Sequence, residues 1–223
     1  MSMNSKLVIF DCDGVLVDSE VLGNVVFAEL LSRNGYEISS AETAKRFRGM
    51  KFADCLEILE RESAIRLPAT FTSDFRQESR LRFEAELQPV PGIVSLIESM
   101  EAPFCVASSG PRSKITDNLR FTGLYSHFSD AIFSSYDLET WKPDPGLFLH
   151  VAEHYGFAPE NCVVIEDSAP GVSAGIAAGM RVLALGSLET IELFPHSTQV
   201  FASIEKIHDY LASVRLARPR VVE

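Results

Sequence analysis

Two acidic residues, one position apart, directly follow the first apolar run of the chain. Leu7–Phe10 is apolar throughout, and Asp11-Cys12-Asp13-Gly14 comes next. Such a run is typical of a parallel strand buried on both faces, and open α/β sheets bind ligands at the carboxyl ends of their strands. Two carboxylates there repel each other unless a cation, a shared proton or an electrophile offsets their charge. The alternative is a plain acidic turn, because Asp and Gly are common just after strands.

A second acidic pair, Glu166-Asp167, follows the apolar run Cys162–Ile165. The carboxyl ends of adjacent parallel strands lie close together, so we expect up to four carboxylates to converge at one edge of the sheet. Carboxylate oxygens suit Mg²⁺, which keeps several waters and takes a further ligand from a phosphate. The two pairs together therefore predict a site for a divalent cation and a phosphorylated ligand.

Two more motifs carry groups that suit a phosphoryl ligand. Ser108-Ser109-Gly110 follows an apolar run, and hydroxyl and backbone N–H groups at a strand-to-helix junction can bind an anion. A serine there can equally be a helix N-cap, and neighbouring serines can fill both roles. Lys142 precedes Pro143-Asp144-Pro145, whose prolines stiffen the backbone, although a lone lysine before a helix is usually solvated. A metal, a lysine, a hydroxyl and an acid pair are the parts that phosphoryl transfer needs.

Apolar runs and helical periodicity alternate along most of the chain. The expected strands are Leu7–Phe10, Phe104–Ser108, Ala131–Ser134, Cys162–Ile165 and Arg181–Leu185. The expected helices between the later strands are Gly92–Met100, Arg112–Phe121, Pro145–Tyr155 and Gly171–Ala178. This alternation predicts an α/β fold, a doubly wound parallel sheet with helices on both faces.

The segment between the first two strands shows no strand pattern and is expected to be helical. We therefore predict a helical cap domain over residues 18–87, inserted into a core domain of residues 1–17 and 88–223, with the cap as a lid above the carboxyl edge of the sheet. The expected cap helices are Glu42–Phe47, opened by a capping box at Ser39-Ser40-Ala41-Glu42, Phe52–Arg61, and a segment capped by Thr72-Ser73-Asp74 that runs to about Leu87.

Composition excludes several classes of partner. The 223 residues are 46% hydrophobic and 23% charged, as in a soluble globular protein, and contain neither a membrane-length apolar run nor a secretory signal. A net charge of −11 argues against nucleic acid as a partner. The four scattered cysteines lack metal-ligand spacing and indicate buried thiols of a reducing cytoplasm. We expect a cytoplasmic monomer with a small-molecule partner and no membrane partner.

Four motifs in order make the chain resemble the haloacid dehalogenase superfamily. They are Asp11–Glu20, Ala107–Gly110, Lys142–Pro145 and Glu166–Gly171, and together they extend over nearly the whole chain. The resemblance is to the subgroup of β-phosphoglucomutases and phosphatases, which carries a small helical cap after the first motif. It implies a Rossmann-like core and an enzyme that transfers or hydrolyses phosphoryl groups.

The resemblance also implies catalytic roles. Asp11 would be the nucleophile that takes the phosphoryl group as an aspartyl-phosphate. Asp13 would protonate the leaving alcohol and then deprotonate the water that hydrolyses this intermediate. Ser108 would hydrogen-bond a phosphoryl oxygen, and Lys142 would offset the negative charge of Asp11 and of the phosphoryl group.

A magnesium site is implied in the same way. The metal ligands would be Asp11, the backbone carbonyl of Asp13, and Asp167. Glu166 would bind the metal directly or through water. Mg²⁺ and Lys142 together would allow a dianionic substrate to approach a carboxylate.

The superfamily contains several chemistries, so the fold alone does not decide between them. A dehalogenase needs neither leaving-group protonation nor a metal, whereas Asp13 and the Glu166-Asp167 pair favour phosphoryl transfer. A β-phosphoglucomutase-type transfer uses a histidine shortly after the first motif, where this chain has Gly23. A non-catalytic module that binds phosphorylated ligands would typically lack the nucleophile or a metal ligand, and this chain has the full set. The prediction is a phosphatase, with the mutase as the alternative.

The cap is expected to select the leaving group. Lys45-Arg46-Phe47-Arg48-Gly49-Met50-Lys51 places four cations close together, and its second half resembles the specificity loop of the subgroup. The resemblance implies a substrate-binding set of Ser109, Gly110, Arg48, Gly49 and Lys51. The alternative is a solvated helix face in which Glu42 pairs with Arg46. Cationic cap residues would suit an acidic sugar phosphate, and the chain looks similar to bacterial phosphatases that act on compounds such as 6-phosphogluconate.

Overall fold

The computed structural model describes residues 6–47, 50, 52–63, 65–186, 192, 194–195 and 198–218. The described chain divides into two compact units. We call the unit Asp18–Gln88 the cap and the remainder the core. No described helix is long and apolar enough to cross a membrane.

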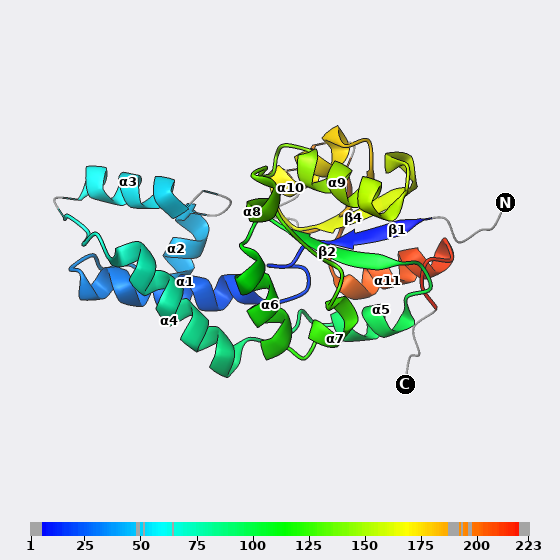
Figure 1. Cartoon of the computed structure of the whole chain (residues 1–223). Coiled ribbons are helices and arrows are strands. Elements are labelled where there is room, and N and C mark those ends of the chain that lie inside the picture. The colour runs from blue at the N-terminus through cyan, green and yellow to red at the C-terminus, as the bar shows by residue number, and fades with distance from the viewer. Residues whose placement is uncertain are drawn as a thin grey trace. The chain divides into compact units, whose positions relative to one another are not determined.

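The core is built on a parallel sheet with the first strand in its centre (Figure 1). The order is β3-β2-β1-β4-β5-β6, and every neighbouring pair is parallel. The strands are β1 (Leu7–Phe10), β2 (Phe104–Ser108), β3 (Ile132–Ser134), β4 (Cys162–Glu166), β5 (Arg181–Leu185) and β6 (Gln199–Phe201). The predicted doubly wound α/β fold is confirmed, while β6 was not predicted.

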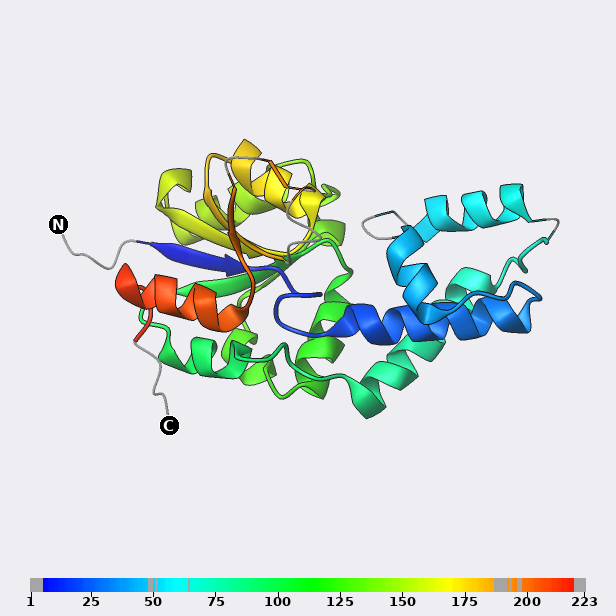
Figure 2. The ribbon, with the colours of Figure 1, turned by 180° about the vertical axis from the view of Figure 1, so that it is seen from behind.

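Helices cover both faces of this sheet (Figures 1 and 2). The pair α9 and α10 lies on one face, and α5 and α11 lie on the other. The core helices are α5 (Ile93–Ser99), α6 (Arg112–Phe121), α7 (Tyr125–Phe128), α8 (Ser135–Leu138), α9 (Gly146–Tyr155), the 3₁₀ turn Pro159–Asn161, α10 (Ala169–Ala177) and α11 (Ile204–Ser213).

The residues of β1 are fully buried and serve two apolar layers. Leu7 and Ile9 pack into the layer that also contains residues of α9 and α10. Phe10 makes edge-to-face contacts with Phe104 and Phe128, with ring centroids 6.1 and 6.2 Å apart. Both faces of β1 are therefore apolar, which explains why this strand has no alternation of polar and apolar residues.

The described part of the cap contains four helices around phenylalanine side chains. They are α1 (Ser19–Arg33), α2 (Ser40–Phe47), α3 (Phe52–Glu62) and α4 (Phe71–Glu86). The ring of Phe27 on α1 contacts the rings of Phe47, Phe52, Phe71 and Phe75 at centroid distances of 5.2–6.2 Å. These rings pack in one core with the buried side chains of Val26, Leu31 and Leu59, and aromatic packing of this kind stabilises a small helical unit.

The helix starts in the cap differ from two predictions. Ser39 and Glu42 form the predicted capping box, because Ser39 N donates to Glu42 Oε2 and Glu42 N donates to Ser39 Oγ. The helix nevertheless begins at Ser40, because the capping residue precedes the first turn rather than lying in it. The predicted cap at Thr72 is wrong: α4 begins at Phe71, with Thr70 at its N-cap position.

The chain enters and leaves the cap through neighbouring segments. On the core side, Val90 N donates to Leu16 O at 3.0 Å, and Val17 forms an antiparallel bridge with Pro89. On the cap side, Asp18 N donates to Gln88 O at 3.0 Å. Backbone contacts therefore close each unit separately at the point where the chain crosses between them.

Candidate active site

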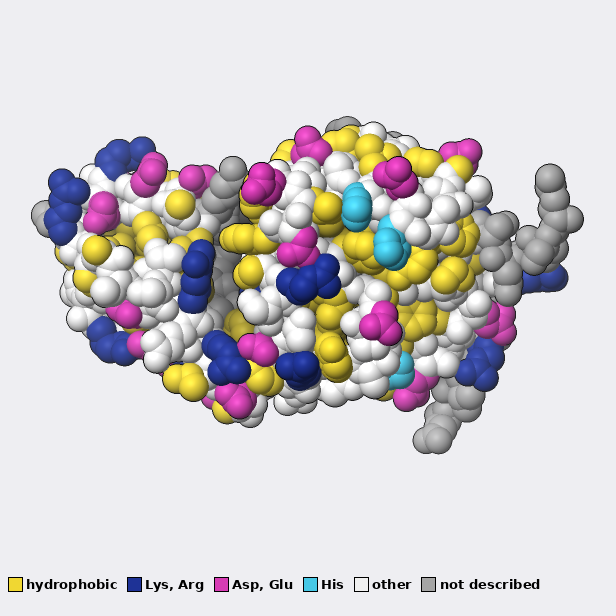
Figure 3. All heavy atoms as spheres, viewed as in Figure 1, with side chains coloured by type: hydrophobic (Ala, Val, Ile, Leu, Met, Phe, Trp, Pro, Cys, Tyr) yellow, Lys and Arg dark blue, Asp and Glu magenta, His cyan; other side chains and the backbone are white. Residues whose placement is uncertain are grey.

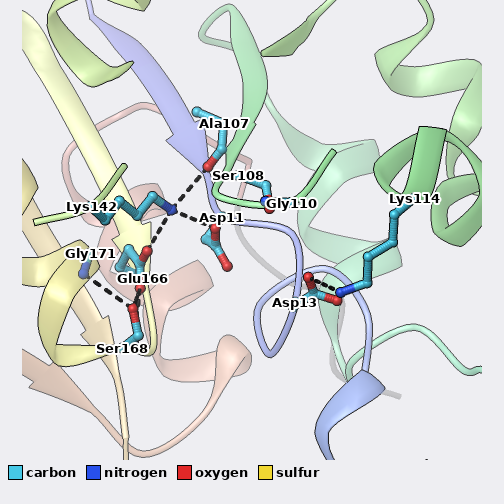
Figure 4. A network of polar contacts seen from close by, with 10 residues as sticks. All are labelled: Asp11, Asp13, Ala107, Ser108, Gly110, Lys114, Lys142, Glu166, Ser168 and Gly171. Atoms are coloured by element: carbon cyan, nitrogen blue, oxygen red, sulfur yellow. Dashed lines mark hydrogen bonds and ion pairs between the residues drawn. The ribbon is translucent and has the colours of Figure 1, made fainter. Parts of the chain in front are cut away.

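Three polar side chains come together at the carboxyl edge of the sheet (Figure 4). Asp11 directly follows β1, Ser108 ends β2 and Glu166 ends β4. The strand register explains this meeting, because Phe10 lies opposite both Val106 and Ile165. Asp11, Ser108 and Glu166, which follow these positions by one or two residues, therefore lie side by side at the edge of the sheet.

Lys142 lies between two of these carboxylates. Its Nζ atom donates to Asp11 Oδ1 at 2.6 Å, to Glu166 Oε1 at 2.7 Å and to the carbonyl oxygen of Ala107 at 3.1 Å. All three charged side chains are buried, and we call Lys142, Asp11 and Glu166 the Lys142 cluster. The alternative of a solvated lysine is wrong, because the ammonium group is enclosed by acceptors that reach it from β1, β2 and β4.

Burial and charge act on the Lys142 cluster in opposite directions. Burial raises the pKa of Asp11 above its ordinary value, Lys142 acts to lower it, and Glu166 adds to the rise. Burial alone would lower the pKa of Lys142, but the carboxylates of Asp11 and Glu166 raise it above its ordinary value. Lys142 therefore stays protonated at neutral pH and carries the positive charge that these acids require.

Glu166 is fixed by donors at both of its oxygens. Oε1 accepts from Lys142, and Oε2 accepts from Ser168 N at 2.8 Å and from Ser168 Oγ at 2.9 Å. Ser168 is also the N-cap of α10, where its hydroxyl accepts from Gly171 N. A Cβ atom on Gly171 would overlap the Glu166 carboxylate. Glycine is therefore needed at this first turn of α10.

A cluster of carboxylates in this region can hold a metal ion. Asp11, Glu166 and Asp167 each offer one oxygen, and these oxygens lie within 4.8 Å of one another. Gly14, at φ +81°, allows the approach of Asp167, because a Cβ atom at this position would overlap that carboxylate. Three carboxylates and one ammonium leave a negative excess that a divalent cation would offset, and an all-oxygen donor set suits Mg²⁺. The residues present fit such an ion.

Asp13 lies apart from the Lys142 cluster. Its Oδ2 accepts from Lys114 Nζ at 2.7 Å, and its Oδ1 accepts from Asn118 Nδ2 at 3.3 Å. Figure 4 shows the Asp13 carboxylate directed at Lys114 on α6 and away from Lys142. We call Asp13, Lys114 and Asn118 the Lys114 cluster. Lys114 and Asn118 were not placed in the site from the sequence alone. Their spacing of four residues puts both on one face of α6.

The loop after β2 is ordered by its own hydrogen bonds. Ser108 is buried, and its hydroxyl oxygen accepts from Gly110 N at 3.1 Å. The carbonyl oxygen of Gly110 accepts from Ser134 Oγ at 2.7 Å. The alternative that a serine caps the next helix is wrong, because α6 begins at Arg112 with Pro111 at its N-cap position. Ser109 and Gly110 are half-buried at this edge of the sheet.

The predicted cap residues Arg48, Gly49 and Lys51 lie outside the described residues. The neighbouring Arg46 is described, and its guanidinium donates to Tyr36 Oη and pairs with Glu62. The alternative in which Arg46 pairs with Glu42 is therefore wrong, because Glu42 is bound to Ser39 in the capping box. Figure 3 shows Lys and Arg side chains of the cap between Asp and Glu side chains, as expected for exposed ion pairs.

Comparison with known proteins assigns this arrangement to a family. Residues 5–179 match the haloacid dehalogenase-like hydrolases. The chain belongs to this family. Over 178 residues it is 36% identical to 6-phosphogluconate phosphatase of Escherichia coli K12, and the alignment covers 79% of this chain and 80% of that protein. It is also 29% identical over 180 residues to the phosphorylated carbohydrates phosphatase of Thermotoga maritima, with 79% and 82% covered.

A solved structure extends the similarity to the whole described architecture. A haloacid dehalogenase family hydrolase from Deinococcus radiodurans R1, with bound phosphate and sodium, superimposes with a TM-score of 0.83 at 27% identity. The match covers 98% of this chain and 100% of that one. With these relatives, this haloacid dehalogenase-like hydrolase is a phosphatase. The prediction of buried cysteines is also confirmed, since all four thiols are free and buried.

Proposed function

We propose that the chain is a Mg²⁺-dependent phosphomonoesterase that acts on a small sugar phosphate through an aspartyl-phosphate. The observation that carries this proposal is the Lys142 cluster beside Asp167, in which a buried carboxylate is paired with a buried ammonium at the end of β1. Two relatives named for phosphorylated sugars, those of E. coli and T. maritima, support the substrate class.

The first step forms the aspartyl-phosphate. A carboxylate oxygen of Asp11 attacks phosphorus, the bond from phosphorus to the sugar oxygen breaks, and Asp13 gives its proton to that oxygen. Lys142 offsets the negative charge that would otherwise keep the phosphoryl group from Asp11. The hydroxyl of Ser108 accepts from Gly110 N, so its own proton remains available for a phosphoryl oxygen.

The second step releases phosphate. Water attacks the phosphorus of the aspartyl-phosphate while Asp13, now ionised, takes its proton, and the bond to Asp11 breaks. Asp11 and Asp13 return to their starting forms. A single carboxyl group therefore acts as acid and then as base, which requires that it keep one position through both steps.

Asp11, Asp167 and the backbone carbonyl of Asp13 would hold the metal ion. Bound Mg²⁺ would withdraw charge from the phosphoryl oxygens and orient the group for in-line attack. We assign Glu166 a supporting role, because Ser168 and Lys142 already donate to its two oxygens. Glu166 would then hold Lys142 in place and reach the metal through water.

We further propose an acidic sugar phosphate such as 6-phosphogluconate as the substrate. The 36% identity to 6-phosphogluconate phosphatase supports this choice. Arg48 and Lys51 would bind the carboxylate of the sugar, Gly49 would allow the backbone turn between them, and Ser109 and Gly110 would contact the phosphoryl group. Replacement of Arg48 and Lys51 by Gln should raise KM for 6-phosphogluconate much more than for p-nitrophenyl phosphate. Equal changes for both compounds would remove this role.

The first experiment measures phosphate release from a panel of sugar phosphates with and without Mg²⁺, for the wild type and for Asp11→Asn. We expect release that needs both the cation and Asp11, with acidic sugars ahead of neutral ones. Conversion of glucose 1-phosphate to its isomer without release would replace the phosphatase by a mutase. The absence of both reactions would contradict the proposed catalysis altogether.

A further inference from the structure

Asp13 is held by two donors that the proposed chemistry leaves without a role. Lys114 and Asn118 lie one helical turn apart on α6, and each donates to a different oxygen of the Asp13 carboxylate. Asn118 is buried, whereas the Lys114 side chain is 42% exposed. A half-exposed lysine can extend into solvent, so its contact with a carboxylate next to the nucleophile calls for a reason.

The backbone around Asp13 is tightly turned, yet this does not fix the side chain. Gly14 N donates to Val17 O at 2.8 Å, and Leu16 N donates to Cys12 O at 2.9 Å. These bonds determine where the Asp13 backbone lies, but χ1 and χ2 of the side chain can still rotate. Donors at both oxygens select one rotamer of the Asp13 side chain.

We propose that Lys114 is a positioning residue, which with Asn118 holds the Asp13 carboxylate in the orientation used for proton transfer. This inference rests on the proposed function, in which Asp13 transfers a proton in each step. Lys114 touches neither phosphorus nor the leaving oxygen and acts only through Asp13.

The test compares two substrates that differ in their need for Asp13. A sugar alkoxide must be protonated as it leaves, whereas p-nitrophenolate leaves as a stable anion. The kcat/KM value reports on events up to departure of the leaving group, so it separates this need from the later attack of water. The measurement is kcat/KM for 6-phosphogluconate, or for the fastest sugar phosphate of the panel, and for p-nitrophenyl phosphate.

We expect Lys114→Met to lower kcat/KM for the sugar phosphate by about 10- to 100-fold, which is part of the value of a general acid. The kcat/KM value for p-nitrophenyl phosphate should change by no more than about threefold, because p-nitrophenolate leaves without protonation. Lys114→Arg should restore most of the loss, because it can still donate to Asp13. Arg120→Gln is the matched control: it removes a cation of α6 whose guanidinium lies 4.7 Å from the Tyr125 ring centre, and should leave both values unchanged.

A double-mutant cycle shows whether Lys114 acts through Asp13. In the Asp13→Asn background, Lys114→Met should cost nothing further on the sugar phosphate, because the group that it positions is gone. Additive losses, equal losses on both substrates, or a faster Lys114→Met enzyme would each overturn the inference. If Asp13→Asn itself hydrolysed the sugar phosphate at the wild-type rate, the role of Asp13 in the proposed function would fail instead.

Discussion

Two lysine–aspartate pairs stand at the same edge of the sheet and differ mainly in burial. In the Lys142 cluster the side chains of Lys142, Asp11 and Glu166 are 4%, 10% and 1% exposed. In the Lys114 cluster the side chains of Lys114 and Asp13 are 42% and 28% exposed, although the ion-pair distance of 2.7 Å is much the same. The ion-pair distances therefore do not distinguish the two clusters, whereas the exposure of their side chains to solvent does.

This difference in burial predicts which lysine is needed for stability and which is needed only for catalysis. Removal of one partner from a buried pair leaves an uncompensated charge and costs about 3–5 kcal/mol, whereas an exposed pair contributes about 0–1 kcal/mol. Lys142 should therefore be needed for the fold and for the chemistry. Lys114 should be needed for the chemistry alone, which is why its effect can be measured without loss of the protein.

The largest effect is expected for Lys142→Met. This change leaves Asp11 and Glu166 buried without their cation, and should lower the free energy of unfolding by about 3–5 kcal/mol. Phosphate release should fall by about 10³-fold or more, because the phosphoryl group would meet uncompensated carboxylates. Urea unfolding followed by circular dichroism measures the first quantity. A loss of less than about 1 kcal/mol would show that water reaches this cluster as freely as it reaches Lys114.

A smaller effect is expected when the support of the buried cluster is disturbed. In Gly171→Ala the added Cβ atom would overlap Glu166, and the resulting shift should lower the free energy of unfolding by about 1–3 kcal/mol and also reduce activity. Gly23→Ala is the control, because no atom lies within 4 Å of a Cβ atom at that helical position. It should raise stability by about 0.5–1 kcal/mol. Equal behaviour of the two variants in thermal unfolding would contradict the packing argument.

The smallest effect is expected on the stability of the exposed cluster. Lys114→Met should change the free energy of unfolding by no more than about 1 kcal/mol, and the change should shrink further in 1 M NaCl because salt screens exposed pairs. The same urea titration as for Lys142→Met measures it. A loss of several kcal/mol would show that Lys114 is structural, and its kinetic effects would then need another explanation.

The sequence predicts the strands of this fold better than the contacts of its site. β1, β2 and β5 have the predicted bounds, because continuous apolar runs end at polar or glycine-containing turns. β6 was missed because Gln199–Phe201 is only three residues long and none of its residues is fully buried. The helix α1 was not delimited either, because its pattern gives no clear apolar face.

The residues of the Lys142 cluster were identified by motif and strand-end position, whereas Lys114 and Asn118 were not identified. In the first set the two acids are fixed by local rules, since each directly follows an apolar run of the sequence and parallel strands bring such ends together. The second set depends on how α6 packs beside the loop after β1, which is a contact between residues about a hundred positions apart. A lysine within a helix carries no local signal that distinguishes a positioning role from a solvated one.

The closure of each unit where the chain crosses between cap and core has a consequence for the order of folding during synthesis. The cap is one continuous segment, so all its helices have been synthesised before β2 is made. The apolar strand β1 emerges first, yet its neighbours β2 and β4 follow only at residues 104–108 and 162–166. The strand before the nucleophile thus has no partner strand until about half of the chain has been made. We expect the nascent chain to depend on chaperones during this interval.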